Sequence, residues 1–162
     1  MVTEDYVSFE IAKLLKEKGF DAKCSFVWAE QGNREPIRMA MPAFVEGEER
    51  ADRKTVDIAA KDYINPYNAE NNSVTGYLCP TIQMATKWLR EVHKLVICAE
   101  IGNENYTGNT DYSNPDIWYW FFDITNERGV VIDTESDFVL NEYTTYEEAC
   151  EAGIKYCLEN LI

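Results

Sequence analysis

The chain has 162 residues, of which 46% are hydrophobic and 27% charged, and its formal charge is −14. This balance and length favour one globular domain with a core, and exclude collagen-like, wholly disordered and disulfide-scaffold classes. The sequence contains no run of 18 consecutive apolar residues, so it predicts no membrane-spanning helix. Residues 1–10 contain three acids and lack the basic and apolar segments of a signal peptide, so we expect a cytoplasmic protein.

Negative charge is concentrated late in the chain. Residues 101–162 contain 13 acidic and 2 basic residues, and so carry −11 of the formal −14. Direct nucleic-acid binding needs the opposite sign and is not expected. The acids either keep this surface solvated or steer the docking of a partner protein with a basic surface.

The chain begins with a predicted helix and hairpin. Apolar residues with helical spacing predict a helix over about residues 6–18, which Gly19 ends. Residues 23–30 alternate as a strand, and the turn signal at 31–33 predicts that residues 37–41 return as its hairpin partner.

The middle of the chain predicts two further helices. Residues 46–76 form a long polar stretch, within which a helix is expected over about 46–63. A connection this long and polar either has a function or is mobile. Pro80 and Thr81 then suit the start of a clearer helix, whose apolar stripe runs over residues 82–92.

Strands dominate the next part of the chain. Residues 95–101 are apolar on both faces, which predicts an interior position in a sheet. An Asn-rich loop over 102–116 follows, and then a strand over 117–125 that carries five consecutive aromatic residues. A turn at 126–129 leads to a short return strand over 130–133.

The last helix completes the predicted fold. Thr145 and Glu148 have the spacing of a capping box, and an apolar stripe follows them. We therefore expect a single α+β domain over residues 1–162. It would contain an antiparallel sheet of about four to five strands, with three or four helices packed mainly on one face.

Three blocks within the predicted helices resemble a known family. They are KLLKEKGFD (13–21), PTIQMATKWLREVH (80–93) and TYEEACEAGIKYCLENLI (145–162). The blocks resemble short uncharacterised proteins encoded by Bacteroides and its relatives, often in prophages and other mobile elements. The resemblance implies a bacterial or phage cytoplasm and a role in phage–host or mobile-element biology. It carries over no catalytic or binding residue.

Residue patterns for catalysis or metal binding are weak. His93 is the single histidine and lies at a predicted helix end, and the five cysteines form no CxxC pair. Asp133, Glu135 and Asp137 alternate like the start of a calcium loop, but Phe138 stands where that loop needs glycine. We therefore expect solvated acids there, no metal, no cofactor and no catalytic residue.

The aromatic strand carries the main functional hypothesis. Alternation places Trp118, Trp120 and Phe122 on one face and Tyr119 and Phe121 on the other. Either both faces are covered, or one row of rings is exposed beside the acidic segment and anchors a partner. The candidate partner-binding residues are Tyr106, Asp111, Tyr112, Asp116, Tyr119, Phe121, Asp133, Glu135 and Asp137.

The expected function is therefore non-enzymatic. We expect a binding or regulatory protein that acts on a basic protein partner, with no direct nucleic-acid contact and no membrane contact. One alternative is a ligand-binding or enzymatic domain with a pocket between the sheet and residues 64–79 or 102–116. The other is a structural subunit that self-associates, as a homodimer, through the aromatic strand.

Overall fold

The computed structural model describes residues 4–40, 50–64, 74–103, 118–134 and 143–162. The chain divides into two compact units, Met1–Ala85 (unit 1) and Thr86–Ile162 (unit 2), and each is described by itself. Both units combine helices with an antiparallel three-stranded sheet, so the predicted α+β class is confirmed. The expectation of a single domain stays a prediction.

Unit 1 is built around the predicted hairpin. β1 (Phe26–Gln31) pairs antiparallel with β2 (Ile37–Ala40), which confirms the hairpin, and on its other side with β3 (Val74–Cys79). The helices of this unit are α1 (Phe9–Glu17) and α2 (Val56–Ile64). β3 is not among the predicted strands, because five of its six residues are buried and its pattern therefore lacks polar alternation.

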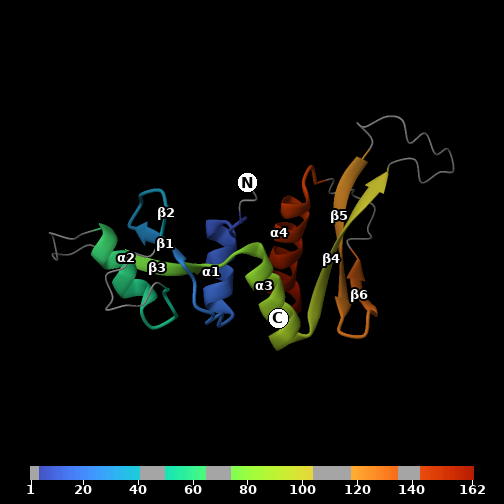
Figure 1. The fold of residues 1–162 in the computed structure, drawn as a ribbon, viewed down its shortest axis with the longest axis horizontal. Coiled ribbons are helices and arrows are strands. Elements are labelled where there is room, and N and C mark those ends of the chain that lie inside the picture. The colour runs from blue at the N-terminus through green and yellow to red at the C-terminus, as the bar shows by residue number, and fades with distance from the viewer. Residues whose placement is uncertain (1–3, 41–49, 65–73, 104–117, 135–142) are drawn as a thin grey trace. The chain divides into compact units, whose positions relative to one another are not determined.

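Helices cover both faces of the unit 1 sheet. On one face, Phe9 of α1 makes edge contacts with the rings of Tyr77 and Trp28, at centroid distances of 5.2 and 5.9 Å. On the other face, α2 places Val56 directly against Gly76. Figure 1 shows the three strands between α2 and α1. This corrects the expectation that the helices pack mainly on one face, because the sheet of β1, β2 and the unpredicted β3 lies between α1 and α2.

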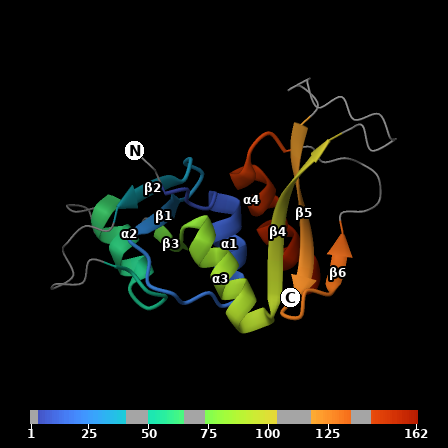
Figure 2. The same ribbon diagram turned by 45° about the vertical axis from the view of Figure 1, so that its right-hand side comes forward.

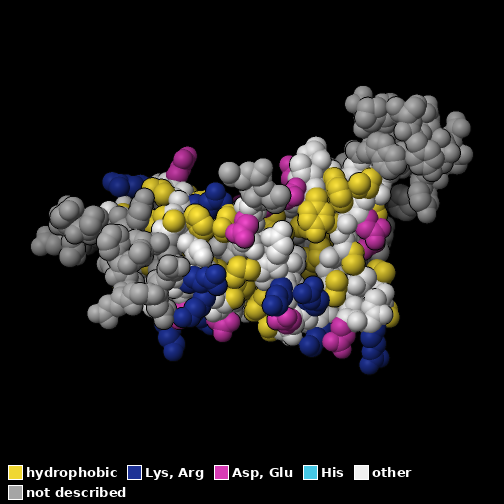
Figure 3. All heavy atoms as spheres, in the orientation of Figure 1, with side chains coloured by type: hydrophobic (Ala, Val, Ile, Leu, Met, Phe, Trp, Pro, Cys, Tyr) yellow, Lys and Arg dark blue, Asp and Glu magenta, His cyan; other side chains and the backbone are white. Residues whose placement is uncertain are grey.

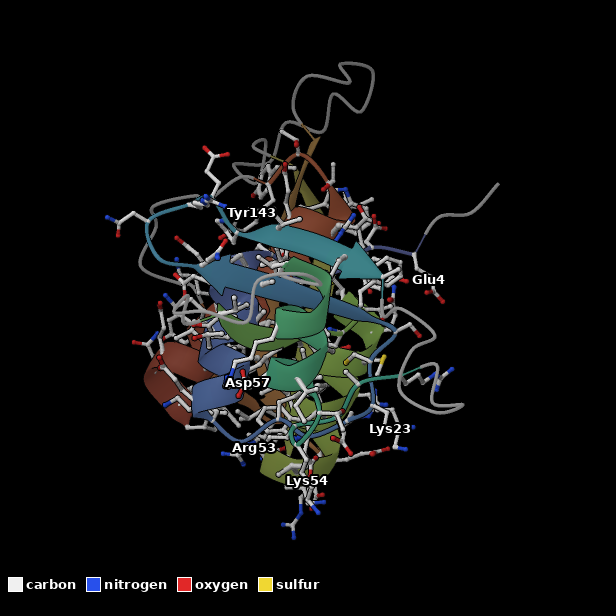
Figure 4. The ribbon with its side chains drawn as sticks, turned by 90° about the vertical axis from the view of Figure 1, so that its left-hand side faces the viewer. Glu4, Lys23, Arg53, Lys54, Asp57 and Tyr143 are labelled. Carbon is white, nitrogen blue, oxygen red and sulfur yellow. The ribbon has the colours of Figure 1, made fainter. Side chains whose placement is uncertain are left out.

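Side chains close the outer edge of β3 at Gly76. The Gly76 N–H donates to Asp57 Oδ1 at 2.9 Å, and Lys16 Nζ donates to the Gly76 carbonyl oxygen at 2.8 Å. Lys16 and Asp57 also form an ion pair, with 3.2 Å between Nζ and Oδ1. Figure 4 shows Asp57 between α2 and α1. These two side chains therefore make the hydrogen bonds that a further strand would make at this position.

The first two helices differ from their predicted ranges mainly at their starts. α1 is shorter than the predicted 6–18, because Tyr6 pairs with Thr81 in an antiparallel bridge instead of joining the helix. It ends as predicted, at Gly19 with a φ of 88°. Of the helix predicted over 46–63, α2 forms the second half; residues 50–55 are not helical, because Ala51 pairs with Cys24 in an antiparallel bridge, and residues 46–49 lie outside the described residues.

A third helix follows the sheet of unit 1. α3 (Ile82–Trp88) continues into a π-helical turn, η1 (Leu89–His93), so the clearer predicted helix is confirmed. Thr81 caps it as predicted, because its Oγ1 accepts a hydrogen bond from the Met84 N–H at 3.2 Å. Lys94, with a φ of 63°, ends the turn in the left-handed conformation.

The sheet of unit 2 has the aromatic strand at its centre. β4 (Leu95–Asn103), β5 (Trp118–Asn126) and β6 (Val131–Thr134) pair antiparallel in that order, with a register shift between Ile124 and Thr125. Among the strands that the structure describes, β4 lies at an edge of this sheet, so the expected interior position is wrong. Its apolar residues lie on both faces without a strand on both sides, a difference that a hydropathy pattern does not show.

The last helix begins at the predicted cap. α4 (Tyr146–Tyr156) continues into a second π-helical turn, η3 (Cys157–Leu161). Thr145 Oγ1 accepts a hydrogen bond from the Glu148 N–H at 3.1 Å, which confirms the cap. The Glu148 carboxylate accepts hydrogen bonds from the Thr144 N–H and hydroxyl, at 2.9 and 2.7 Å, and these bonds lower its pKa.

Helix α4 covers one face of the unit 2 sheet. A Cβ at Gly153 would lie 2.8 Å from Cγ2 of Ile97 and 3.2 Å from Cδ2 of Phe122, so only glycine permits this approach. Figure 2 shows α4 passing behind β4 and β5. Across the described parts of the chain there are thus four α-helices, within the predicted range. Two three-stranded sheets replace the single sheet of about four to five strands that we expected.

Candidate functional site

The structure places three of the nine candidate residues. Tyr119 and Phe121 lie on β5, and Asp133 lies on β6 opposite Ile124 in the register. The other six fall outside the described residues: Tyr106, Asp111, Tyr112, Asp116, Glu135 and Asp137. The candidate site is therefore built from the two rings of β5 and from what the register brings beside them.

Strand β5 has one covered face. Phe122 and Ile124 are buried, and the Phe122 ring lies 6.2 Å from that of Tyr156 on α4. Trp120, on the same face, makes an edge contact with Tyr146 at 5.4 Å. Successive side chains of a strand point to opposite faces of the sheet. Tyr119, Phe121 and Asp123 therefore point away from α4.

We name the face of this sheet opposite α4 the open face. Strand pairing places Glu100 opposite Phe121 and Gly102 opposite Tyr119. Glu100 is exposed, and the other members are half-buried. In Figure 3, hydrophobic and acidic side chains lie next to one another over β4 and β5. The open face is formed by Val96, Cys98, Glu100, Gly102, Tyr119, Phe121, Asp123 and Thr125.

The ring of Tyr119 lies across β4 on top of Gly102. A Cβ at position 102 would lie 2.6 Å from Cε2, 2.7 Å from Cζ and 2.9 Å from Oη of that ring. Any other residue would push the ring away, so glycine allows the aromatic side chain to rest on the neighbouring strand. The Phe121 ring lies 6.2 Å from the Tyr119 ring, at an interplanar angle of 56°.

The charge of the open face is wholly negative. Its charged members are Glu100 and Asp123, and within the described part of the chain neither has an ion-pair partner. Unit 2 as a whole contains 15 acidic and 5 basic residues, a formal charge of −10. The face therefore combines half-exposed rings with carboxylates.

The single histidine and the cysteines are the remaining residues that could take part in catalysis. His93 ends η1 and packs edge-on against Trp88, with 4.6 Å between ring centroids. All five cysteines are free thiols. Burial raises the pKa of Cys24 and of Cys157 to about 12, which disfavours the nucleophilic thiolate. Among the described residues, no group of three or more His, Cys, Asp or Glu has the geometry to hold a metal ion.

Two hollows are found among the described residues of unit 1. One, between α1 and α2, has about 10 Å³ of space, roughly enough for a single water molecule. The other, of about 250 Å³, lies beside the β1–β2 turn and includes Arg34, whose Nη1 donates to Oε1 of the buried Gln31 at 3.1 Å. Neither hollow has a histidine or a cysteine among its described lining residues. A nucleophile and its base are therefore not brought together at these two places.

Of the eight members of the open face, only Tyr119 and Phe121 are among the candidate residues; Glu100 and Gly102 are two of the six that are not. Their position beside the rings follows from the β4–β5 register, and a connection as long as 104–117 does not specify a register. In the sequence, the one sign of this contact is a glycine inside an apolar strand, because such a glycine often marks a place where another group approaches the backbone closely.

No protein-family model, curated protein or solved structure matches the chain. Along the described parts, no helix has both the length and the apolar composition needed to span a bilayer.

Proposed function

We propose that this protein is a non-enzymatic binding or regulatory protein that holds a basic partner protein on the open face of unit 2. The supporting observation is the two-sided character of β5. Phe122 is buried under α4, whereas Tyr119 and Phe121 stay half-exposed beside Glu100 and Asp123. Aromatic side chains anchor protein interfaces, and carboxylates on the same face select a positively charged partner.

The charge of unit 2 supports a basic protein rather than other classes of partner. A formal charge of −10 repels nucleic acid and anionic membrane surfaces, and it steers a cationic protein toward unit 2. Self-association through the aromatic strand stays the second candidate. It is less favoured because a second copy would bring like charges together.

Origin and compartment stay part of the proposal. The resemblance of residues 13–21, 80–93 and 145–162 to proteins of Bacteroides prophages and mobile elements supports a phage or mobile-element origin. A protein of that origin would meet its basic partner in the cytoplasm of the bacterial host.

The test compares three immobilised proteins in bacterial lysate at low and at high salt, with captured proteins quantified by mass spectrometry. They are the wild type, a Tyr119→Ser/Phe121→Ser double variant and an Ile58→Ser control. Ile58 is 55% exposed on α2, so the control removes exposed apolar surface from unit 1 and leaves every member of the open face in place.

The proposal expects basic proteins that the wild type and the control retain at low salt, and that the double variant and high salt release. Capture that is equal for the wild type and the folded double variant would refute it. Light scattering of the wild type tests the second candidate, which requires a dimer that the double variant does not form.

A further inference from the structure

Unit 1 shows how this chain covers aromatic rings on a sheet. The Arg38 guanidinium of β2 lies over three rings, those of Tyr6, Phe26 and Trp28, at 5.3, 6.0 and 6.0 Å from their centroids. A guanidinium stacks on aromatic faces because it is planar and weakly hydrated, and the ring quadrupole attracts its charge. The rings of that face are thus matched by a cation from the same chain.

The open face of unit 2 has rings and carboxylates without a cation of its own. Among the described residues, no Lys or Arg lies over Tyr119 or Phe121. From position 101 to the C-terminus the sequence has only Arg128 and Lys155. Arg128 lies in the turn between β5 and β6, and Lys155 lies on α4, which covers the opposite face. A cation on the open face must therefore come largely from outside this part of the chain.

We infer that the open face binds the guanidinium groups of arginine side chains on the partner protein. This inference rests on the proposed function and names the chemistry that the partner must present.

The geometry of the open face suits a stacked and hydrogen-bonded guanidinium. Cε2, Cζ and Oη of Tyr119 lie against Gly102, and the side chain is half-buried, so part of the ring stays accessible to a partner. Glu100 is opposite Phe121, and directly paired residues have Cβ atoms about 4.5–5.5 Å apart, so its carboxylate lies beside the rings. An arginine stacked on Tyr119 can therefore donate its fork of N–H groups to Glu100, which the point-like ammonium of lysine does less well.

The probes are two synthetic peptides of alternating residues, one of glycine and arginine and one of glycine and lysine. Binding to the full chain is followed at low salt by ¹H–¹⁵N NMR, which reports both the affinity and the amides that shift. We expect the arginine peptide to shift amides of β4 and β5 and to bind about threefold more tightly than the lysine peptide.

Four variants separate the contributions. Glu100→Gln is expected to weaken arginine-peptide binding about threefold, whereas Glu159→Gln, which removes an exposed charge from η3, should change it little. Tyr119→Leu should remove the preference for arginine over lysine and leave a weaker attraction to both. Gly102→Ala, which displaces the Tyr119 ring, should act like Tyr119→Leu if its spectrum shows a folded protein.

The outcomes distinguish this inference from the function on which it rests. If the lysine peptide binds the open face as tightly as the arginine peptide, the guanidinium site is wrong while a basic partner remains. If Glu159→Gln weakens binding as much as Glu100→Gln, the attraction is one of net charge and the site is also wrong. If neither peptide shifts the open face, the inference fails, and lysate capture then decides separately whether the proposed function fails with it.

Discussion

Glycine at position 76 is required by the packing of α2 on β3, and Gly76→Ala tests that packing. The added Cβ would lie 2.3 Å from the Val56 carbonyl oxygen, 2.8 Å from its carbonyl carbon and 3.0 Å from its Cγ2. Backbone atoms cannot rotate out of the way as a flexible side chain can. The helix and the strand must therefore separate by roughly 0.7 Å to restore a contact of 3.0 Å to the oxygen.

The size of the effect follows from what this separation disturbs. Overpacking of this kind costs about 1–3 kcal/mol, and the shift also stretches the bonds that Asp57 and Lys16 make to Gly76, so we expect a loss of about 3 kcal/mol. Gly32→Ala is the control. Gly32 has a φ of 56° with no atom within 4 Å of its added Cβ, so that variant should lose only about 1 kcal/mol from backbone strain.

The assay is urea unfolding followed by ¹H–¹⁵N NMR, which resolves the two units. The indole N–H of Trp28 reports on unit 1, because it donates to the Val7 carbonyl oxygen at 3.2 Å. If Gly76→Ala unfolds at the same urea concentration as Gly32→Ala, with the same slope, then α2 does not pack on Gly76 as described and the reasoning fails.

Two further predictions concern stability. Thr145→Ala should lower the stability of unit 2 by about 1 kcal/mol, because it removes the side-chain cap of α4; urea unfolding measures this. Alkaline pH should destabilise unit 1. Burial raises the pKa of Cys24 to about 12, and burial with the hydrogen bond to Glu30 raises that of Tyr77 to about 12, so the unfolded chain loses these protons first and stability falls as the pH rises from 9 toward 12. Urea midpoints measured across this range should fall, and the fall should be shallower in Tyr77→Phe.

These two predictions have their own controls. Unit 1 resonances should be unchanged by Thr145→Ala, and a variant as stable as the wild type in unit 2 would show that the cap contributes nothing. Midpoints that stay level up to pH 12, or that fall equally in Tyr77→Phe, would contradict the stated origin of the alkaline effect.

Local signals predicted the elements whose formation is local. The turn at residues 31–33 specified the β1–β2 hairpin, and Gly19 and Thr145 specified one end each of α1 and α4. Alternation along β5 also assigned its two faces in advance, because the period of a strand does not depend on its neighbours.

What the pattern missed depends on partners distant in sequence. The sequence of β3 shows no alternation of apolar and polar residues, because α1 covers one of its faces and α2 the other. The sequence of β4 predicts an interior strand, whereas β4 lies at an edge of the described sheet. Glu100 and Gly102 are brought beside the rings of Phe121 and Tyr119 only by the β4–β5 register, which the sequence pattern does not contain. Six of the nine candidate residues were chosen from stretches outside the described residues, so they stay predictions.

The Lys16–Asp57 pair has a consequence for the behaviour of this protein at high concentration. An outermost strand can recruit the same strand of another molecule and start a cross-β stack, and β3 is largely apolar. The N–H and the carbonyl oxygen of Gly76 are already hydrogen-bonded to Asp57 and Lys16. An incoming strand would first have to displace both side chains and break the ion pair between them. Fibril growth from this border should therefore be slow, and neutralising either member of the pair should hasten it.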